Sequence, residues 1–282
     1  MKIYYIHRII TFCISTNILV AFAAFSLYKV TELLFNFQDS NLGLFIFFST
    51  LCAYNYMRLS IVLDFNQYNL QSKKISQDKK TLYFIFLISI FAILSLFVIL
   101  GYSFFKLVLP GILISLLYPF SIKIKKKFYS IRQIPFLKIF LIAFTWSYIT
   151  VLVPLWYHDF KVDYFMLDIF FQRLLFVIAI SIPFDIRDCD TDNIMTIPNT
   201  IGIIESKFFA WFCLLIIDIL LIIDVIIHHI TLPSFVASFI SIEICALLIY
   251  YSNKNRHLLF YGFFVESLSI IMCLFVLIAS FF

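Results

Sequence analysis

The sequence predicts an all-α polytopic membrane protein, a bundle of about nine transmembrane helices. Three observations lead to this fold class. Hydrophobic residues make up 63% of the 282 residues and charged residues only 13%, which is too apolar a balance for a soluble domain. Apolar runs of roughly 20 residues, the length that crosses a bilayer, recur along the whole chain. The charged residues gather mostly in the short polar connections between these runs.

The apolar runs follow one another closely, and no low-complexity linker divides them. We expect nine spans, near residues 9–28, 42–63, 81–100, 103–120, 135–156, 167–186, 207–227, 231–251 and 258–281. The longest polar insert, residues 64–80, is too short for a domain but long enough for a cap over one end of the bundle. Residues 1–282 are therefore expected to form a single transmembrane helical domain.

The amino terminus allows two interpretations. Lys2, Arg8 and the stretch Ala21–Ala23 resemble a cleavable signal peptide. The apolar run from Ile9 to Leu27 is longer than the usual core of such a peptide, and further spans follow it. We therefore favour an uncleaved first span.

Basic residues lie on one side of the expected membrane topology. Cytoplasmic connections are enriched in lysine and arginine. With nine spans and the amino terminus inside, this rule places the following residues on the cytoplasmic side: Lys2, Arg8, Lys73, Lys74, Lys79, Lys80, Lys123, Lys125, Lys126, Lys127, Arg132, Arg187, Lys207, Lys254 and Arg256. The sequence thus predicts an integral protein of the cytoplasmic membrane with membrane lipid as a partner. The net charge of +5 arises in these connections and is no sign of nucleic-acid binding.

Acidic residues crowd onto the end of the sixth expected span. If this end is helical, each residue turns about 100°, and Asp185, Asp188 and Asp192 fall within an arc of about 60°. Asp190 and Arg187 then point away from that arc. Three carboxylates on one face repel one another unless a cation lies among them, and oxygen ligands suit Mg²⁺ or Ca²⁺. The stretch therefore predicts a divalent metal site that opens to the cytoplasm.

The same stretch resembles the second aspartate motif of the UbiA superfamily of intramembrane prenyltransferases. Residues Phe184–Asp192 fit the family pattern D-x-x-D-x-x-x-D, and Thr196–Gly202 resembles the segment that follows it. The residues Leu117–Phe120 and Arg132–Pro135 are similar to the family's loop between the fourth and fifth helices. The dihydroxynaphthoate polyprenyltransferase branch is the most similar in this motif. A nine-helix bundle with a cytoplasmic site is also the family architecture.

The resemblance implies a Mg²⁺-dependent transfer of a prenyl group from a polyprenyl diphosphate to a hydrophobic acceptor, aromatic or lipid-like. It implies metal ligands, diphosphate contacts and one acceptor contact, with no catalytic residue assigned beyond them. The metal ligands would be Asp185, Asp188 and Asp192, the diphosphate contacts Asn55, Arg58, Arg132 and Lys123, and the acceptor contact Tyr118. The apolar interior of the bundle would take the isoprenoid tail.

The first aspartate motif of the family is degenerate in this chain. Asn55 matches the motif, but Tyr56 and Leu59 stand where the family has aspartates, and the last aspartate is lost or displaced to Asp64. Arg58 lies near the Asn55 face of the helix. We hypothesise that it takes the place of one metal ion, since an arginine binds phosphate bidentately. The alternative is an ordinary edge arginine that reaches lipid phosphates.

Two other functions remain open from the sequence. A non-catalytic UbiA-like protein that binds an isoprenoid or a partner protein would explain the degenerate first motif. A transporter with a carboxylate ion site is less favoured, because the sequence shows no internal repeat of the kind many transporters have. We favour the enzyme, a prenyltransferase.

Overall fold

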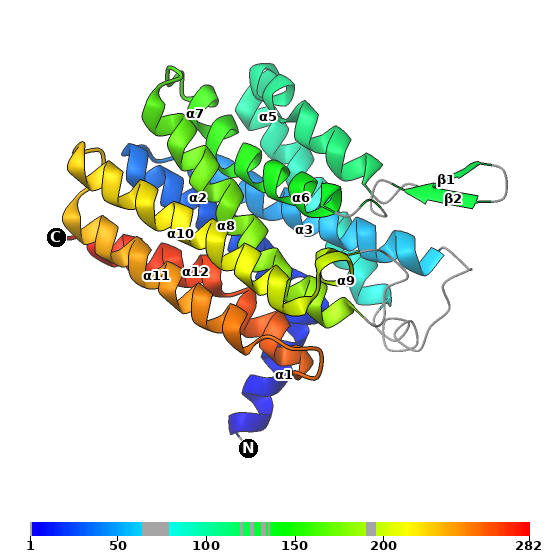
Figure 1. Cartoon of the computed structure of the whole chain (residues 1–282). Helices are drawn as coiled ribbons and strands as arrows, with labels where there is room; N and C mark the ends of the chain where they lie inside the picture. Colours follow the sequence, from blue (N-terminus) through cyan, green and yellow to red (C-terminus); the bar gives the residue numbers. More distant parts are fainter. Residues whose placement is uncertain are drawn as a thin grey trace.

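The computed structural model describes residues 2–63, 79–118, 121–124, 127–130, 134, 136–189 and 196–282. This part of the chain is almost entirely helical (Figure 1). The helices are α1 (Lys2–Ser15), α2 (Ile18–Phe35), α3 (Ser40–Leu63), α5 (Lys79–Leu117), α6 (Leu137–Ser147), α7 (Val153–Tyr157), α8 (Tyr164–Asp188), α9 (Ile197–Ile201), α10 (Ile203–Ile226), α11 (Leu232–Tyr251) and α12 (Leu268–Ala279).

Two turns of π-helix, η2 (Tyr148–Leu152) and η3 (Phe260–Val265), join helices into longer apolar segments. Through η2, α6 and α7 become one segment, Leu137–Tyr157, and η3 extends α12 in the same way to Phe260–Ala279. Eight segments of the described chain are then long and apolar enough to cross a membrane. The chain is therefore an integral membrane protein.

The longest of these segments, α5, consists of two helices. Gly101 at its middle has φ 82° and ψ 176°. This conformation interrupts a helix, and residues other than glycine rarely adopt it. Lys79–Leu100 and Tyr102–Leu117 are thus separate apolar helices. Counted in this way, the described chain contains nine apolar segments, and the predicted fold class is confirmed.

The amino-terminal boundary differs from the prediction. We expected one span over residues 9–28, but α1 ends at Ser15 and α2 begins at Ile18. Asn17 between them has φ 60°, a left-handed conformation that Asn tolerates better than most residues and that ends a helix. The first apolar segment of membrane length is therefore α2, and α1 projects from the end of the bundle (Figure 1).

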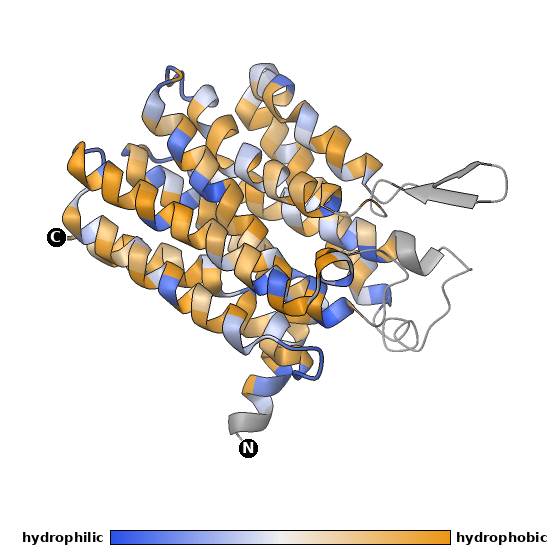
Figure 2. Ribbon diagram, viewed as in Figure 1, coloured by the Kyte–Doolittle hydropathy of each residue, from blue (hydrophilic) through white to orange (hydrophobic). Residues whose placement is uncertain are grey.

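The outer surface of the bundle is apolar, as a surface in contact with lipid must be (Figure 2). Large side chains such as Phe91 and Val98 are 75% and 85% exposed on α5. Inside, one buried cluster joins α2, α6, α8 and α10 to α12, and a second joins α2, α3, α5 and α7.

Helices α3 and α8 finish, and α6 and α10 begin, at the same end of the bundle. We call it the aspartate end. The short helix α9 lies beside the end of α8 there (Figure 1). A hairpin of β1 (Ser121–Ile124) and β2 (Lys127–Ser130) stands in the connection between α5 and α6 at the same end. This hairpin was not expected from the sequence.

Candidate functional site

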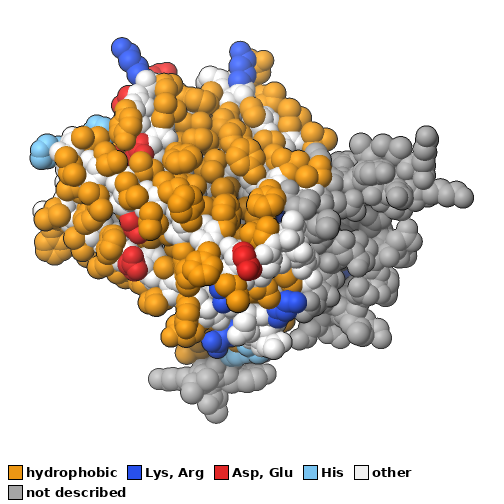
Figure 3. Space-filling view, in the orientation of Figure 1, with side chains coloured by type: hydrophobic (Ala, Val, Ile, Leu, Met, Phe, Trp, Pro, Cys, Tyr) orange, Lys and Arg blue, Asp and Glu red, His pale blue; other side chains and the backbone are white. Residues whose placement is uncertain are grey.

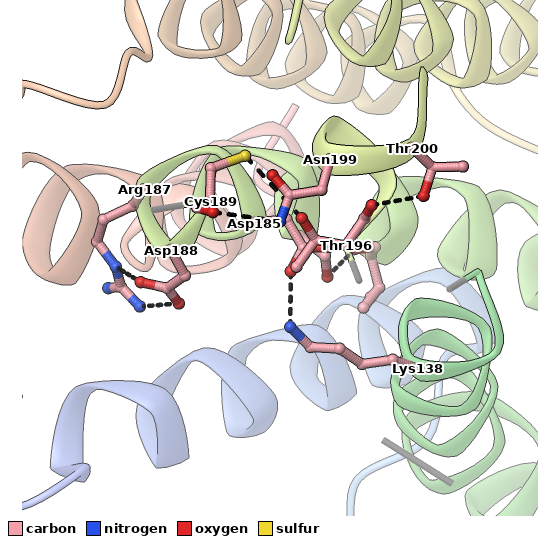
Figure 4. A network of polar contacts seen from close by, with 10 residues as sticks. Lys138, Asp185, Arg187, Asp188, Cys189, Thr196, Asn199 and Thr200 are labelled. Carbon is pink, nitrogen blue, oxygen red and sulfur yellow. Dashed lines mark hydrogen bonds and ion pairs between the residues drawn. The ribbon is translucent and has the colours of Figure 1, made fainter. Parts of the chain in front are cut away.

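Asp185 is buried in the last turn of α8, only 3% exposed. Its Oδ1 accepts a hydrogen bond from the Lys138 Nζ at 2.7 Å, and the backbone N–H of Ile197 donates to the same carboxylate. Lys138 comes from the first turn of α6 (Figure 4). An ionised carboxylate is kept at this depth only when a cation or hydrogen-bond donors compensate its lost hydration. Lys138 and Ile197 supply that compensation.

Asp188 lies one turn further along the same face of α8, where it binds its neighbour Arg187. The guanidinium donates from Nε at 2.6 Å and from Nη2 at 2.7 Å to the two carboxylate oxygens. We expected Arg187 to point away from the aspartate face, but its long side chain folds back onto it (Figure 4). This bidentate geometry is the one by which arginine also holds phosphate.

Aromatic rings and a second carboxylate surround the guanidinium of Arg187. Its Cζ lies 5.3 Å from the centre of the Phe184 ring and 5.8 Å from that of Tyr261. Glu266, half-buried between η3 and α12, interacts with it electrostatically. The described groups Asp185, Asp188 and Glu266 carry three formal negative charges against the two positive charges of Lys138 and Arg187. Over these five described groups, the negative formal charges exceed the positive ones by one.

The segment after the aspartate motif folds back onto the end of α8. Asn199 Nδ2 donates to the backbone oxygen of Cys189 at 3.2 Å, which satisfies a carbonyl that the helix end leaves open. The Thr200 hydroxyl donates to the Thr196 oxygen at 2.9 Å (Figure 4). Gly202, with φ 100°, then turns the chain into α10. These contacts fix the position of the two aspartates relative to α9 and α10.

Residues of the degenerate first motif hold the break between α1 and α2. Asn55 is fully buried on α3, where its Nδ2 donates to the Thr16 oxygen at 3.2 Å and its Oδ1 accepts from Asn17 Nδ2 at 2.9 Å. Arg58, one turn on, donates from Nη1 to the Ser15 oxygen. Their predicted contact with a diphosphate stays a prediction, and in the structure each of them bonds to the helix break.

The remaining predicted residues lie at the same end or outside the described chain. Tyr118 follows α5 directly and is close to Tyr54 of α3, which in turn packs edge-on against Trp146 with ring centres 6.4 Å apart. Lys123 is placed by its backbone in β1, opposite Phe128. The other two, Arg132 and Asp192, lie outside the described residues.

The donors present suit Mg²⁺ better than a softer metal. Asp185 and Asp188 offer carboxylate oxygens, and Mg²⁺ typically takes one or two carboxylates together with substrate phosphates. No group of three or more histidine, cysteine or acidic side chains able to hold a metal occurs within the described residues. Two carboxylates and the local excess of negative charge fit a hard divalent cation that a diphosphate helps to coordinate.

Lys138 and Glu266 were not predicted from the sequence as members of the site. Each is an ionisable residue inside an apolar span, which is by itself a signal of function or pairing. Applied to every span, that signal would have found both. Their partners could not be found in this way, since Lys138 and Asp185 are 47 residues apart in the chain.

Neither a protein-family model nor a curated protein matches the sequence. Solved structures do match its fold. A UbiA homologue from Aeropyrum pernix K1 is 11% identical with a TM-score of 0.68, over 92% of this chain and 97% of that chain. A UbiA homologue from Archaeoglobus fulgidus, bound to GPP and Mg²⁺, is 12% identical with a TM-score of 0.63, over 95% and 100% of the two chains.

A third similar structure is that of a digeranylgeranylglyceryl phosphate synthase, which is 17% identical with a TM-score of 0.55. The match covers 95% of this chain and 94% of that chain. The match therefore spans nearly the whole of each protein. Because all three identities are low, the likeness concerns the arrangement of the helices. This chain has the fold of the UbiA homologues, as the aspartate motif predicted.

Proposed function

We propose that the chain is a diverged UbiA-type prenyltransferase, which moves a prenyl group from a polyprenyl diphosphate to an aromatic or lipid-like acceptor in a Mg²⁺-dependent reaction. The observation that carries the proposal is the aspartate end of α8. Asp185 and Asp188 lie one turn apart there, each beside a cation that can also bind phosphate. The fold supports it, because one structure of this fold contains GPP and Mg²⁺.

Asp185, Asp188 and Asp192 are the residues proposed to hold Mg²⁺. When bound, the ion would neutralise negative charge on the diphosphate and so make it a better leaving group. The two described aspartates are buried or half-buried, where charge interactions are screened less than in water. An added cation would also offset the negative charge of Glu266 beside Arg187.

Cationic side chains of the chain are proposed to bind the diphosphate itself. As the allylic carbon–oxygen bond breaks, its electron pair moves to the bridging oxygen, and positive donors next to the diphosphate stabilise the charge that develops. Lys138 and Arg187 are suited to this role by their place, and the rings of Phe184 and Tyr261 orient the Arg187 donors. Arg58, Arg132, Lys123 and Asn55 are the further contacts that the motif resemblance implies.

The acceptor is proposed to enter beside Tyr118. The cationic allylic carbon is then captured by a nucleophilic atom of the acceptor, which afterwards loses a proton. Tyr54 lies next to Tyr118 and packs against Trp146, and these rings offer aromatic surface on which a flat acceptor can stack. The isoprenoid tail would extend into the apolar interior. The basic connections favour an aspartate end that faces the cytoplasm, with the amino terminus on the same side.

A second function is favoured by one observation. Tyr56 and Leu59 stand where the family has aspartates, and their neighbours Asn55 and Arg58 bind the break between α1 and α2. The alternative is a non-catalytic UbiA-like protein that binds an isoprenoid without transferring it. Both functions place the diphosphate at the aspartate end, and they differ in turnover.

Turnover by the purified protein in detergent distinguishes the two functions. The assay supplies geranylgeranyl diphosphate, Mg²⁺ and a panel of aromatic acids, and mass spectrometry detects prenylated products. We expect product with the unaltered protein and none with Asp185→Asn/Asp188→Asn. Binding of the diphosphate without product favours the non-catalytic alternative. If the protein neither binds nor converts the diphosphate, both proposals fail.

A further inference from the structure

Two carboxylates lie inside the membrane-spanning helices α10 and α11, apart from the site at the aspartate end. Asp218 is eight residues before the last residue of α10, and Glu243 is eight residues before the last residue of α11. At a rise of 1.5 Å per residue, each lies at least about 12 Å along its helix from the nearer end. The two carboxylates are close enough to interact electrostatically.

Both acids line an open groove on the outer surface, where lipid would otherwise cover the bundle. The groove has a volume of about 360 Å³. The surface around it is apolar, with exposed side chains such as Leu215 and Leu247, and carboxylate atoms are set into that surface (Figure 3). A charged side chain that faces hydrocarbon is costly, and acids are too short to reach the interface from mid-membrane as lysine and arginine do.

No described residue forms an ion pair with either of these acids. The buried Asp218 Oδ1 has no hydrogen-bond partner among the described residues, which include both helices in full. The nearest basic residue along α10, Lys207, donates instead to the Tyr250 oxygen at 2.8 Å. A buried carboxylate oxygen without a partner indicates that something outside the described chain completes the site.

The two helices that form the groove are joined by contacts that do not involve the acids. Trp211 Nε1 donates to the Ala246 oxygen at 3.1 Å, and the Trp211 ring stacks on Tyr250 with centres 6.2 Å apart. These bonds fix α10 against α11 on one side of the acid pair. Ala246 on the groove wall is small, and small residues let a further helix approach closely in a membrane.

We propose that this groove is a docking site for a transmembrane helix of a partner protein that carries a lysine or arginine at mid-span. The charge of that residue would pair with Asp218 and Glu243. A lipid headgroup does not fit, because it stays at the interface, about 12 Å or more from the acids along either helix.

A second copy of this chain is a poor occupant of the groove. The cations within its described spans are engaged or lie near helix ends: Lys29 with Glu32, Lys138 with Asp185, Arg187 with Asp188, Arg58 with the Ser15 oxygen, Arg173 with the Leu27 oxygen, Lys207 with the Tyr250 oxygen, and Lys106 near the break at Gly101. The proposal therefore concerns a different protein, and it does not depend on the proposed enzymatic activity.

The test measures binding of model transmembrane peptides to the full-length protein in liposomes by resonance energy transfer. The donor dye is on a carboxyl-terminal tag, and the acceptor dye is on a leucine–alanine peptide with one central lysine. Two control peptides have leucine at that position or the lysine moved to one end. We expect the centred lysine to bind about tenfold more tightly than either control, the size of one good polar contact between membrane helices.

Variants of the protein identify the site that the peptide uses. Asp218→Asn/Glu243→Gln should abolish the preference for the centred lysine, and Glu205→Gln, in the first turn of the same helix, should preserve it. Equal binding of the three peptides to the unaltered protein overturns the proposal without any question of misfolding. An energy-transfer signal between two copies of the chain, lost in the double variant, would assign the groove to self-association and overturn it as well.

Discussion

Removal of Lys138 should destabilise the protein through Asp185. Lys138→Met keeps most of the apolar stem of the side chain and deletes its ammonium group. The Nζ of that group lies 2.7 Å from Asp185 Oδ1. Both side chains are largely buried, 14% and 4% exposed, so the remaining carboxylate would have little access to water. Leaving one partner of a buried ion pair uncompensated costs about 3–5 kcal/mol. Taking about 2 °C per kcal/mol for a chain of this size, the melting temperature should fall by about 6–10 °C.

A second substitution separates the lost charge pair from lost packing. Lys138→Met/Asp185→Asn removes both charges, and should recover at least about half of the lost stability, because no buried charge remains unpaired. The assay is thermal unfolding in detergent, followed by tryptophan fluorescence and by recovery of the monodisperse peak in size-exclusion chromatography. Arg187→Met, which removes the half-buried partner of Asp188, is the matched control and should cost less.

The same variants report on the proposed metal. If Mg²⁺ binds at Asp185, it competes with Lys138 for the same oxygens, so added Mg²⁺ should raise the melting temperature of Lys138→Met more than that of the unaltered protein. A double variant no more stable than Lys138→Met would refute the ion-pair reasoning. Equal shifts with Mg²⁺ in both proteins would refute competition at this carboxylate.

Three further outcomes follow from contacts at the same end of the bundle. Arg58→Ala should weaken diphosphate binding about tenfold or more, since a hydrogen bond to a charged group contributes about 1.5–3 kcal/mol. If calorimetry finds the same affinity for the variant, Arg58 does not belong to the diphosphate site. Asn55→Ala leaves the Asn17 amide unpaired in the core and should lower the free energy of unfolding by about 1–3 kcal/mol. An unchanged melting temperature would contradict the role of Asn55 at the break between α1 and α2. Gly202→Ala places a Cβ 2.2 Å from Glu205 Oε2 at φ 100°. The strained backbone alone should cost about 1–3 kcal/mol, so Gly202→Ala/Glu205→Ala should remain destabilised, and full recovery would show that the contact alone matters.

Hydropathy was enough to predict the membrane helices, because each helix needs apolar side chains over the full width of the bilayer, whether they face the core or the lipid. Even the division of α5 followed from the sequence, since Gly101 stands between two apolar runs. The break at Asn17 could not be predicted in this way. Only the three polar residues Ser15–Asn17 mark it, too few to lower the hydropathy of a span-length stretch, and its left-handed backbone is held by a distant residue, Asn55.

The candidate site could be predicted in part, for a similar reason. The face shared by Asp185 and Asp188 follows from helical geometry, which is local. The partners of these aspartates are of two kinds: Arg187 is adjacent in the chain, but Lys138 is brought in by the packing of α6 against α8. The pairing of Arg187 also depends on the direction of its side chain. Its place on the helix points away from Asp188, but the flexible side chain folds back to bind that carboxylate.

The central claim is that the aspartate end of α8 binds a prenyl diphosphate through a divalent cation. Isothermal titration of the purified protein with a non-hydrolysable geranylgeranyl diphosphate analogue, in Mg²⁺ and then in chelator, tests it most directly. We predict binding that requires Mg²⁺ and that Asp185→Asn/Asp188→Asn abolishes. The same affinity in chelator, and in the double variant, would contradict the claim.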